Sequence, residues 1–102
     1  MYLIQILLPL RDNQQRPFAR DEFDRVRREL TERFGGATFY ARSPAVGLWK
    51  DDDGDVTRDE IVVAEVMAQH QDREWWRLYR ETLERRFRQD QIVVRMMQCG
   101  LL

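Results

Sequence analysis

The chain has 102 residues, of which 43% are apolar and 34% are charged, and its formal net charge is −1. A chain of this length forms one domain with a single core, and the composition is that of a globular protein rather than a disordered or membrane one. The 17 basic residues, nearly all arginine, are intermixed with 18 acidic ones. No basic stripe is left for nucleic acid, so we expect no nucleic-acid partner.

Several further classes of protein are excluded by what the sequence lacks. The single cysteine, Cys99, rules out an internal disulfide and a cysteine metal cluster. The apolar run Tyr2–Leu10 is too short to span a bilayer and has no signal-peptide flanks. The acidic run Asp51–Asp55 does not supply all the oxygens of a calcium loop. We therefore expect a cytoplasmic protein without a membrane partner, metal or cofactor.

The first half of the chain predicts a strand, a helix and a second strand. Tyr2–Leu10 is apolar on both faces except at Gln5, which is typical of a strand in the middle of a covered sheet. Ala19–Phe34 has helical periodicity, and Gly35 is expected to end that helix in the left-handed conformation. Ala37–Arg42 alternates as a second strand.

The second half repeats the pattern in the order strand, helix, strand. The central strand is Asp59–Ala68, apolar on both faces with Glu65 in its middle. Asp72 is expected to cap a second helix through its side chain. The buried stripe of this helix is predicted at helical spacing: Trp76, Tyr79, Leu83 and Phe87. Gln91–Gln98 forms the last strand.

This order predicts an α+β domain over residues 1–102 with a ferredoxin-like βαββαβ fold. The sheet would be four-stranded and antiparallel, in the order last, first, third, second strand. Both helices would then pack on one face of the sheet. The two most apolar strands occupy its centre, which supports the assignment independently.

Residue parity assigns side chains to the two faces of the sheet. The even-numbered set is purely apolar and is expected under the helices: Ile4, Ile6, Leu8, Val62, Ala64, Val66, Ala68, Ile92, Val94 and Met96. The odd-numbered set is mostly apolar and would stay uncovered. Soluble monomers rarely expose so large an apolar face, so we predict a homodimer in which a second copy covers this face.

Each of three predicted strands contributes one polar residue to the odd-numbered face, namely Gln5, Glu65 and Arg95. Two interpretations remain open. In one, Arg95 and Glu65 pair across Gln5 as a structural ion pair. In the other, the row lines a cleft, where Glu65 is a candidate catalytic general base and Gln5 and Arg95 bind a ligand.

Three further residues are candidates for the same site. His70 is the only histidine and follows the central strand, so it is a second candidate acid or base, although an exposed loop histidine is the commoner case. Tyr40 on the second strand is a candidate ligand contact. Trp49 could cover the partner's open face, pack locally or line the ligand site.

Four segments of the chain resemble a small uncharacterised bacterial protein family of about this length: Phe34–Thr38, Gly47–Trp49, Asp59–Val63 and Phe87–Ile92. The resemblance implies a fold and no activity. The topology is also similar to that of the dimeric α/β-barrel proteins, which include cofactor-free monooxygenases and isomerases. This similarity implies a small, often aromatic ligand in the cleft between sheet and helices, by analogy of fold alone.

Two functional hypotheses follow. The first is a homodimeric protein that binds a small molecule or regulates a process without catalysis. The second is a small cofactor-independent enzyme of the dimeric α/β-barrel type, monooxygenase- or isomerase-like, with Glu65 or His70 as acid or base. A cavity that holds one of these groups beside apolar walls would favour the enzyme.

Overall fold

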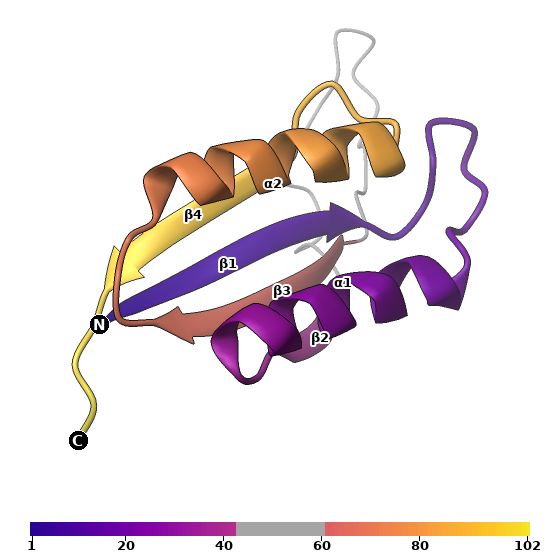
Figure 1. The fold of residues 1–102 in the computed structure, drawn as a ribbon. Coiled ribbons are helices and arrows are strands. Elements are labelled where there is room, and N and C mark those ends of the chain that lie inside the picture. The colour runs from indigo at the N-terminus through magenta and orange to yellow at the C-terminus, as the bar shows by residue number, and fades with distance from the viewer. Residues whose placement is uncertain (43–60) are drawn as a thin grey trace, which may run out of the picture.

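The computed structural model describes residues 1–42 and 61–102 (Figure 1). Within these ranges the elements follow in the predicted order. They are β1 (Tyr2–Pro9), α1 (Arg20–Phe34), β2 (Thr38–Arg42), β3 (Ile61–Ala68), α2 (Arg73–Arg86) and β4 (Val93–Gln98). Trp49, the acidic run at 51–55 and the first two residues of the predicted central strand lie outside the described residues.

The four strands form one antiparallel sheet in the order β2-β3-β1-β4. This is the predicted order read from the opposite edge, so that prediction is confirmed. β1 pairs with β3 along its whole length and with β4 on its other side, while β2 extends the sheet beyond β3. The most apolar strands, β1 and β3, therefore lie at the centre.

Helix α1 forms where an apolar stripe meets clear end signals. Val26 and Leu30 are fully buried on its inner face. Gly35 follows the last residue with φ 83°, and its N–H donates to the carbonyl of Thr31 at 2.8 Å. A side chain is strained at such a φ, so glycine is the favoured residue here, as predicted.

The start of α2 corrects one prediction. Asp72 is the N-cap residue, but its side chain makes no capping hydrogen bond. Its backbone is left-handed, with φ 46°, whereas a capping side chain reaches the helix N–H groups from extended backbone. The Asp72 carboxylate instead accepts from Arg33 Nη2 at 3.4 Å, which links the start of α2 to the end of α1.

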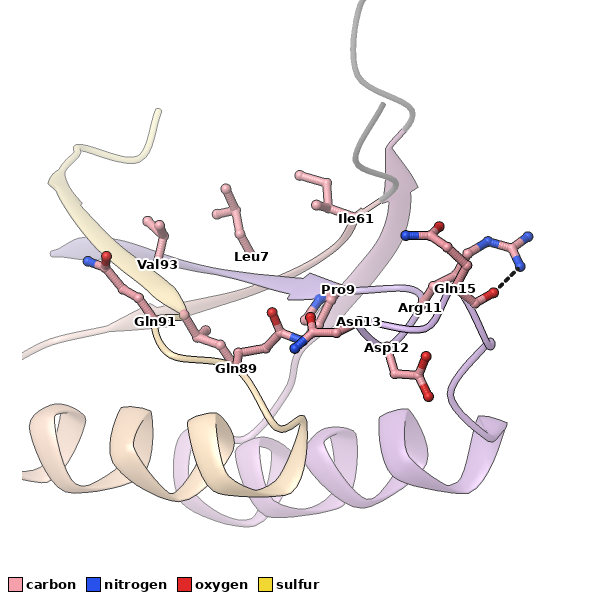
Figure 2. A pocket seen from close by; sticks show the side chains of 11 residues that line it. Leu7, Pro9, Arg11, Asp12, Asn13, Gln15, Ile61, Gln89, Gln91 and Val93 are labelled. Atoms are coloured by element: carbon pink, nitrogen blue, oxygen red, sulfur yellow. Dashed lines mark hydrogen bonds between the residues drawn. The ribbon is translucent and has the colours of Figure 1, made fainter. Parts of the chain in front are cut away.

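Both helices pack against the even-numbered face of the sheet, as predicted. Figure 2 shows the two helices on one side, with Leu7, Ile61 and Val93 pointing to the other. Among the described residues, the core cluster contains Ile4, Ile6, Leu8, Val26, Leu30, Ala64, Val66, Ala68, Trp76, Tyr79, Leu83, Phe87 and Ile92. Every strand residue in that list has an even number. Parity alone thus sorted the two faces of the three long strands.

A polar network joins the two helices above this core. Glu29 of α1 accepts from both terminal nitrogens of Arg86 at 2.5 and 2.6 Å, and from the hydroxyl of Tyr79 at 3.0 Å. The hydrogen bonds from Arg86 are the main reason that the pKa of Glu29 lies below its ordinary value. A bidentate pair of this kind stabilises the contact between the two helices and also favours one geometry of that contact.

No helix within residues 1–42 and 61–102 is long and apolar enough to cross a membrane.

Candidate functional site

The three polar residues of the odd-numbered face lie in one line across the sheet. The register places Gln5 of β1 directly opposite Glu65 of β3 on one side and Arg95 of β4 on the other. Directly opposed side chains on one face of an antiparallel pair lie within interaction distance. The sheet itself therefore assembles this row, and no loop is needed to bring the groups together.

Hydrogen bonds connect the row from end to end. Arg95 donates from Nε to Gln5 Oε1 at 2.7 Å, and Gln5 donates from Nε2 to Glu65 Oε1 at 2.5 Å. The hydroxyl of Tyr40, on β2, donates to the same oxygen at 2.6 Å. We call Arg95, Gln5, Glu65 and Tyr40 the polar row. The structure brings together four of the six candidate residues.

The polar row holds Glu65 in its ionised form. Hydrogen bonds from Tyr40 and Gln5 lower the pKa of the carboxyl below its ordinary value, and the charge of Arg95 adds to this. Desolvation acts in the opposite direction but is the smaller effect. A carboxylate with a lowered pKa is a weaker base, so this geometry suits hydrogen bonding to a ligand better than proton abstraction.

The two charged residues of the polar row, Glu65 and Arg95, have unused hydrogen-bonding capacity. The hydrogen bonds from Gln5 and Tyr40 to Glu65 both end on Oε1, and among the described residues none reaches Oε2. Arg95 uses Nε, and within the same ranges its terminal nitrogens have no acceptor. An ionised carboxylate accepts at both oxygens and a guanidinium has five N–H donors, so both Glu65 and Arg95 can bind a further group.

Around the polar row the face is apolar and partly exposed. Exposure varies across it, since Val63 on β3 is buried whereas Val93 on β4 is 46% exposed. Met67 and Met97 are also exposed large apolar side chains. Gln5, in contrast, is only 8% exposed. The structure therefore places a charged and hydrogen-bonded line within an apolar surface.

A hollow of about 500 Å³ lies where this face meets one end of the sheet (Figure 2). Leu7, Ile61 and Val93 belong both to the open face and to the wall of the hollow. The rest of the wall is largely polar and comes from two loops: Arg11, Asp12, Asn13, Gln15, Gln89 and Gln91. The hollow is thus an extension of the open face, with amide side chains at its end.

Asp12 shapes one of these two loops. Its Oδ1 accepts from the backbone N–H groups of Gln14 and Arg16 at 2.8 and 2.9 Å, and the N–H of Arg16 is the main cause of its lowered pKa. Asn13 then donates from Nδ2 to the carbonyl of Arg88 at 3.5 Å, which joins the two loops. Asp12 is therefore a structural residue in this hollow.

The sequence prediction did not include the amide-lined hollow. In the sequence, the run Arg11–Pro17 is polar, which indicates a loop but not a pocket. Gln89 and Gln91 come from the far end of the chain. Their approach to Asn13 depends on tertiary structure, so spacing in the sequence could not reveal it.

His70 does not join the polar row. It is exposed and lines a separate depression at the opposite end of the sheet, with Arg33 and Asp72. Those two residues pair with one another. Trp49 and the acidic run at 51–55 lie outside the described residues. Within the described ranges no group of three potential ligands could hold a metal ion.

Comparison with solved structures finds a similar fold in a phage SAM lyase determined in complex with S-methyl-5'-thioadenosine. The TM-score is 0.64, and the match covers 95% of this chain and 80% of that chain. The two sequences are 13% identical, so the likeness is one of fold alone. No family model and no curated protein matches the chain.

Proposed function

We propose that this chain is a ferredoxin-like cytoplasmic protein that forms a homodimer through its open sheet face and binds a small molecule beside the polar row. It would belong with the bacterial proteins that its sequence resembles. One observation carries the proposal: a continuous hydrogen-bonded row, charged at two positions, crosses an exposed apolar face. Polar groups placed with unused capacity on an apolar wall are typical of small-molecule sites.

The charges on the open face support a second copy as its cover. Glu65 and Arg95 lie on opposite sides of Gln5 in one line. A two-fold axis between the two sheets and perpendicular to that line would set the carboxylate side of each face opposite the partner's guanidinium side, with the ligand held between the two faces. Self-complementary surfaces of this kind define a two-fold interface, in which the same patch is used twice. Burial of Met97 and Val93 would supply the hydrophobic contribution.

The polar row also indicates what kind of molecule would bind. The Oε2 atom of Glu65 accepts N–H or O–H donors, and the terminal nitrogens of Arg95 bind an anionic group. The two residues belong to strands separated by β1, so their backbones lie roughly 10 Å apart at the usual strand spacing. We therefore expect a bipolar ligand with a donor group at one end and an anionic group at the other.

Binding is favoured over the enzymatic alternative. General-base catalysis by Glu65 requires a pKa near the working pH, whereas its neighbours lower that pKa. His70 lines a different depression, so it would not act on the same ligand atom. The fold neighbour is a lyase, but a shared fold does not transfer an activity.

Native mass spectrometry of the purified protein tests both parts of the proposal. We expect a dimer mass at micromolar concentration and a small molecule that dissociates on activation. Glu65→Gln should retain the fold and lose at least about ten-fold in ligand occupancy or affinity, the loss expected for one charge-assisted hydrogen bond. Glu32→Gln changes an exposed carboxylate on α1 in the same way and is the matched control.

The outcomes separate the two parts. A monomeric mass would overturn the dimer, and Val93→Asp should produce that mass if the open face is the interface. S-methyl-5'-thioadenosine, which the fold neighbour binds, is the first added probe. A dimer that carries no small molecule, and whose open-face NMR signals do not respond to this probe or to free amino acids, would overturn the binding function.

A further inference from the structure

A second, smaller hollow of about 200 Å³ lies between α2 and the outer edge of β4. It is distinct from the amide-lined hollow, with which it has no wall residue in common. Its floor is apolar and is built from Ile4, Val94, Met96 and Trp76. A volume of this size matches a molecule with one small ring or a short aliphatic chain, below the range of sites for drug-sized ligands.

The wall of this hollow is strongly cationic. Four arginines line it, Arg73, Arg77, Arg80 and Arg95, and no carboxylate of the described residues does. Arg73, Arg77 and Arg80 recur at spacings of four and three on α2, so they share one side of that helix. Arg95 lies across the hollow on β4.

Among the described residues, acids closely neutralise only one of these four arginines. Arg77 pairs with Glu74 at 2.6 Å and with Glu81 at 3.1 Å. Arg80 lies 3.9 Å from Glu84, beyond hydrogen-bond distance, because Glu84 accepts instead from the backbone N–H of Ile92.

Arg73 and Arg95 have no carboxylate within ion-pair distance in the described parts of the chain. Each donates from Nε to a glutamine, namely Gln71 and Gln5. Three guanidiniums therefore face this hollow with little or no compensating charge, which favours an anionic occupant.

Two buried donors in the wall also lack partners. Among the described residues, Trp76 Nε1 and Arg80 Nε are the buried side-chain atoms without a hydrogen bond. Trp76 itself is 7% exposed. A buried unsatisfied donor costs stability and calls for an explanation, and a bound acceptor is one. Both atoms belong to residues of the same hollow.

We propose that this hollow is a binding site for a small hydrophobic carboxylic acid. The apolar part of the acid packs on Val94, Met96 and the indole of Trp76. Its carboxylate accepts hydrogen bonds from Trp76 Nε1 and the Arg80 guanidinium. The side chain of Arg80 is 42% exposed and only loosely paired, so it can turn toward the acid. The carboxylate contacts use Trp76 and Arg80, so the site does not depend on the dimer, and it shares only Arg95 of its wall with the polar row.

Titration with 3-phenylpropionate, followed by the tryptophan indole N–H signals in ¹H–¹⁵N spectra, tests this site. Trp76→Phe identifies the signal of Trp76 by its loss. We expect the acid to move that signal downfield, since the N–H gains an acceptor. The neutral analogue 3-phenylpropionamide should bind at least about ten-fold more weakly, because it lacks the charge.

Arg80→Met should weaken binding of the acid by at least about ten-fold and leave the affinity for the neutral amide unchanged. Arg85→Met is the matched control, since Arg85 is an exposed arginine on a different side of the same helix. Three results would overturn the proposal. The first is no response of the Trp76 signal up to about 10 mM acid, since a specific site binds more tightly than that. The second is an equal loss of affinity for the acid in Arg85→Met and Arg80→Met. The third is a response of the Trp76 signal to inorganic phosphate as large as its response to the acid.

Discussion

The two faces of the sheet are built from the same strands, yet they have different compositions and different roles. On the helix side, Ile6 and Leu8 are fully buried. On the other side, Val93 and Met97 are 46% and 42% exposed, and the polar row crosses the centre. A face that serves only stability can be wholly apolar. A face that combines apolar and charged groups is suited to something outside the chain.

The largest expected effect belongs to the helix-covered face. Phe87 is fully buried, and its ring contacts those of Phe18 and Phe23 at centroid distances of 5.0 and 5.6 Å. Phe87→Ala should lower the free energy of unfolding by about 3–5 kcal/mol, because it removes packing and leaves a cavity. Urea unfolding measures this loss. A loss below about 1 kcal/mol, within the range of surface substitutions, would show that the two faces do not differ in this way.

The ion pair between the helices comes next and adds a dependence on pH. Glu29→Gln leaves Arg86 without its carboxylate and should cost about 2 kcal/mol at pH 7. The pKa of Glu29 is lowered in the folded state from an ordinary value of 4.5. Its contribution is therefore present above pH 4.5 and is lost as the pH falls through the lowered value.

The difference in unfolding free energy between the wild type and Glu29→Gln tests this assignment. It should stay constant from about pH 7 to 5 and shrink at lower pH. Urea unfolding across that range measures the difference. If the difference grows on acidification, the pKa shift has been assigned the wrong sign. The exposed Glu32→Gln is again a suitable control.

The smallest effect gives the most direct comparison, because Met96 and Met97 are neighbours on opposite faces. Met96 packs against the helix-side core, whereas Met97 is 42% exposed. Met96→Ala should cost about 1 kcal/mol, from partial burial at about 0.8 kcal/mol per methylene. Met97→Ala should cost the isolated subunit less than about 0.5 kcal/mol.

Unfolding measured at increasing protein concentration sharpens the comparison of the two methionines. If a second copy covers the open face, Met97→Ala should become more costly as the dimer forms, since burial in the dimer links stability to concentration. The cost of Met96→Ala should not change. Equal costs for the two substitutions at low concentration would contradict the assignment of faces.

Much of the fold could be predicted because its signals are local. The apolar runs of β1 and β3 and the period in the two helices needed only neighbouring residues. The polar row followed from the same alternation, because Gln5, Glu65 and Arg95 all fall on the odd-numbered face. The part played by Tyr40 was harder to foresee, since β2 pairs Tyr40 with Val63 and its hydroxyl reaches Glu65 diagonally.

The prediction was incomplete where the backbone takes uncommon conformations. Asp72, Gln15 and Arg88 have positive φ without being glycine. The residue types at these positions do not predict a positive φ. The predicted side-chain cap at Asp72 was wrong because its backbone adopts this conformation. Gln15 lies in one of the two loops of the amide-lined hollow, and Arg88 accepts the bond that joins these loops. The second site, between α2 and β4, also needed the tertiary packing to be known.

The amide of Gln5 gives the polar row a direction. It donates toward the carboxylate and accepts from the guanidinium, so its two ends are matched to the charges beside it. A half-turn of the amide about its last side-chain bond exchanges donor and acceptor. The same glutamine would then serve a sheet in which acid and base had changed places. A linker of this kind tolerates exchange of the charges but not the loss of its own amide.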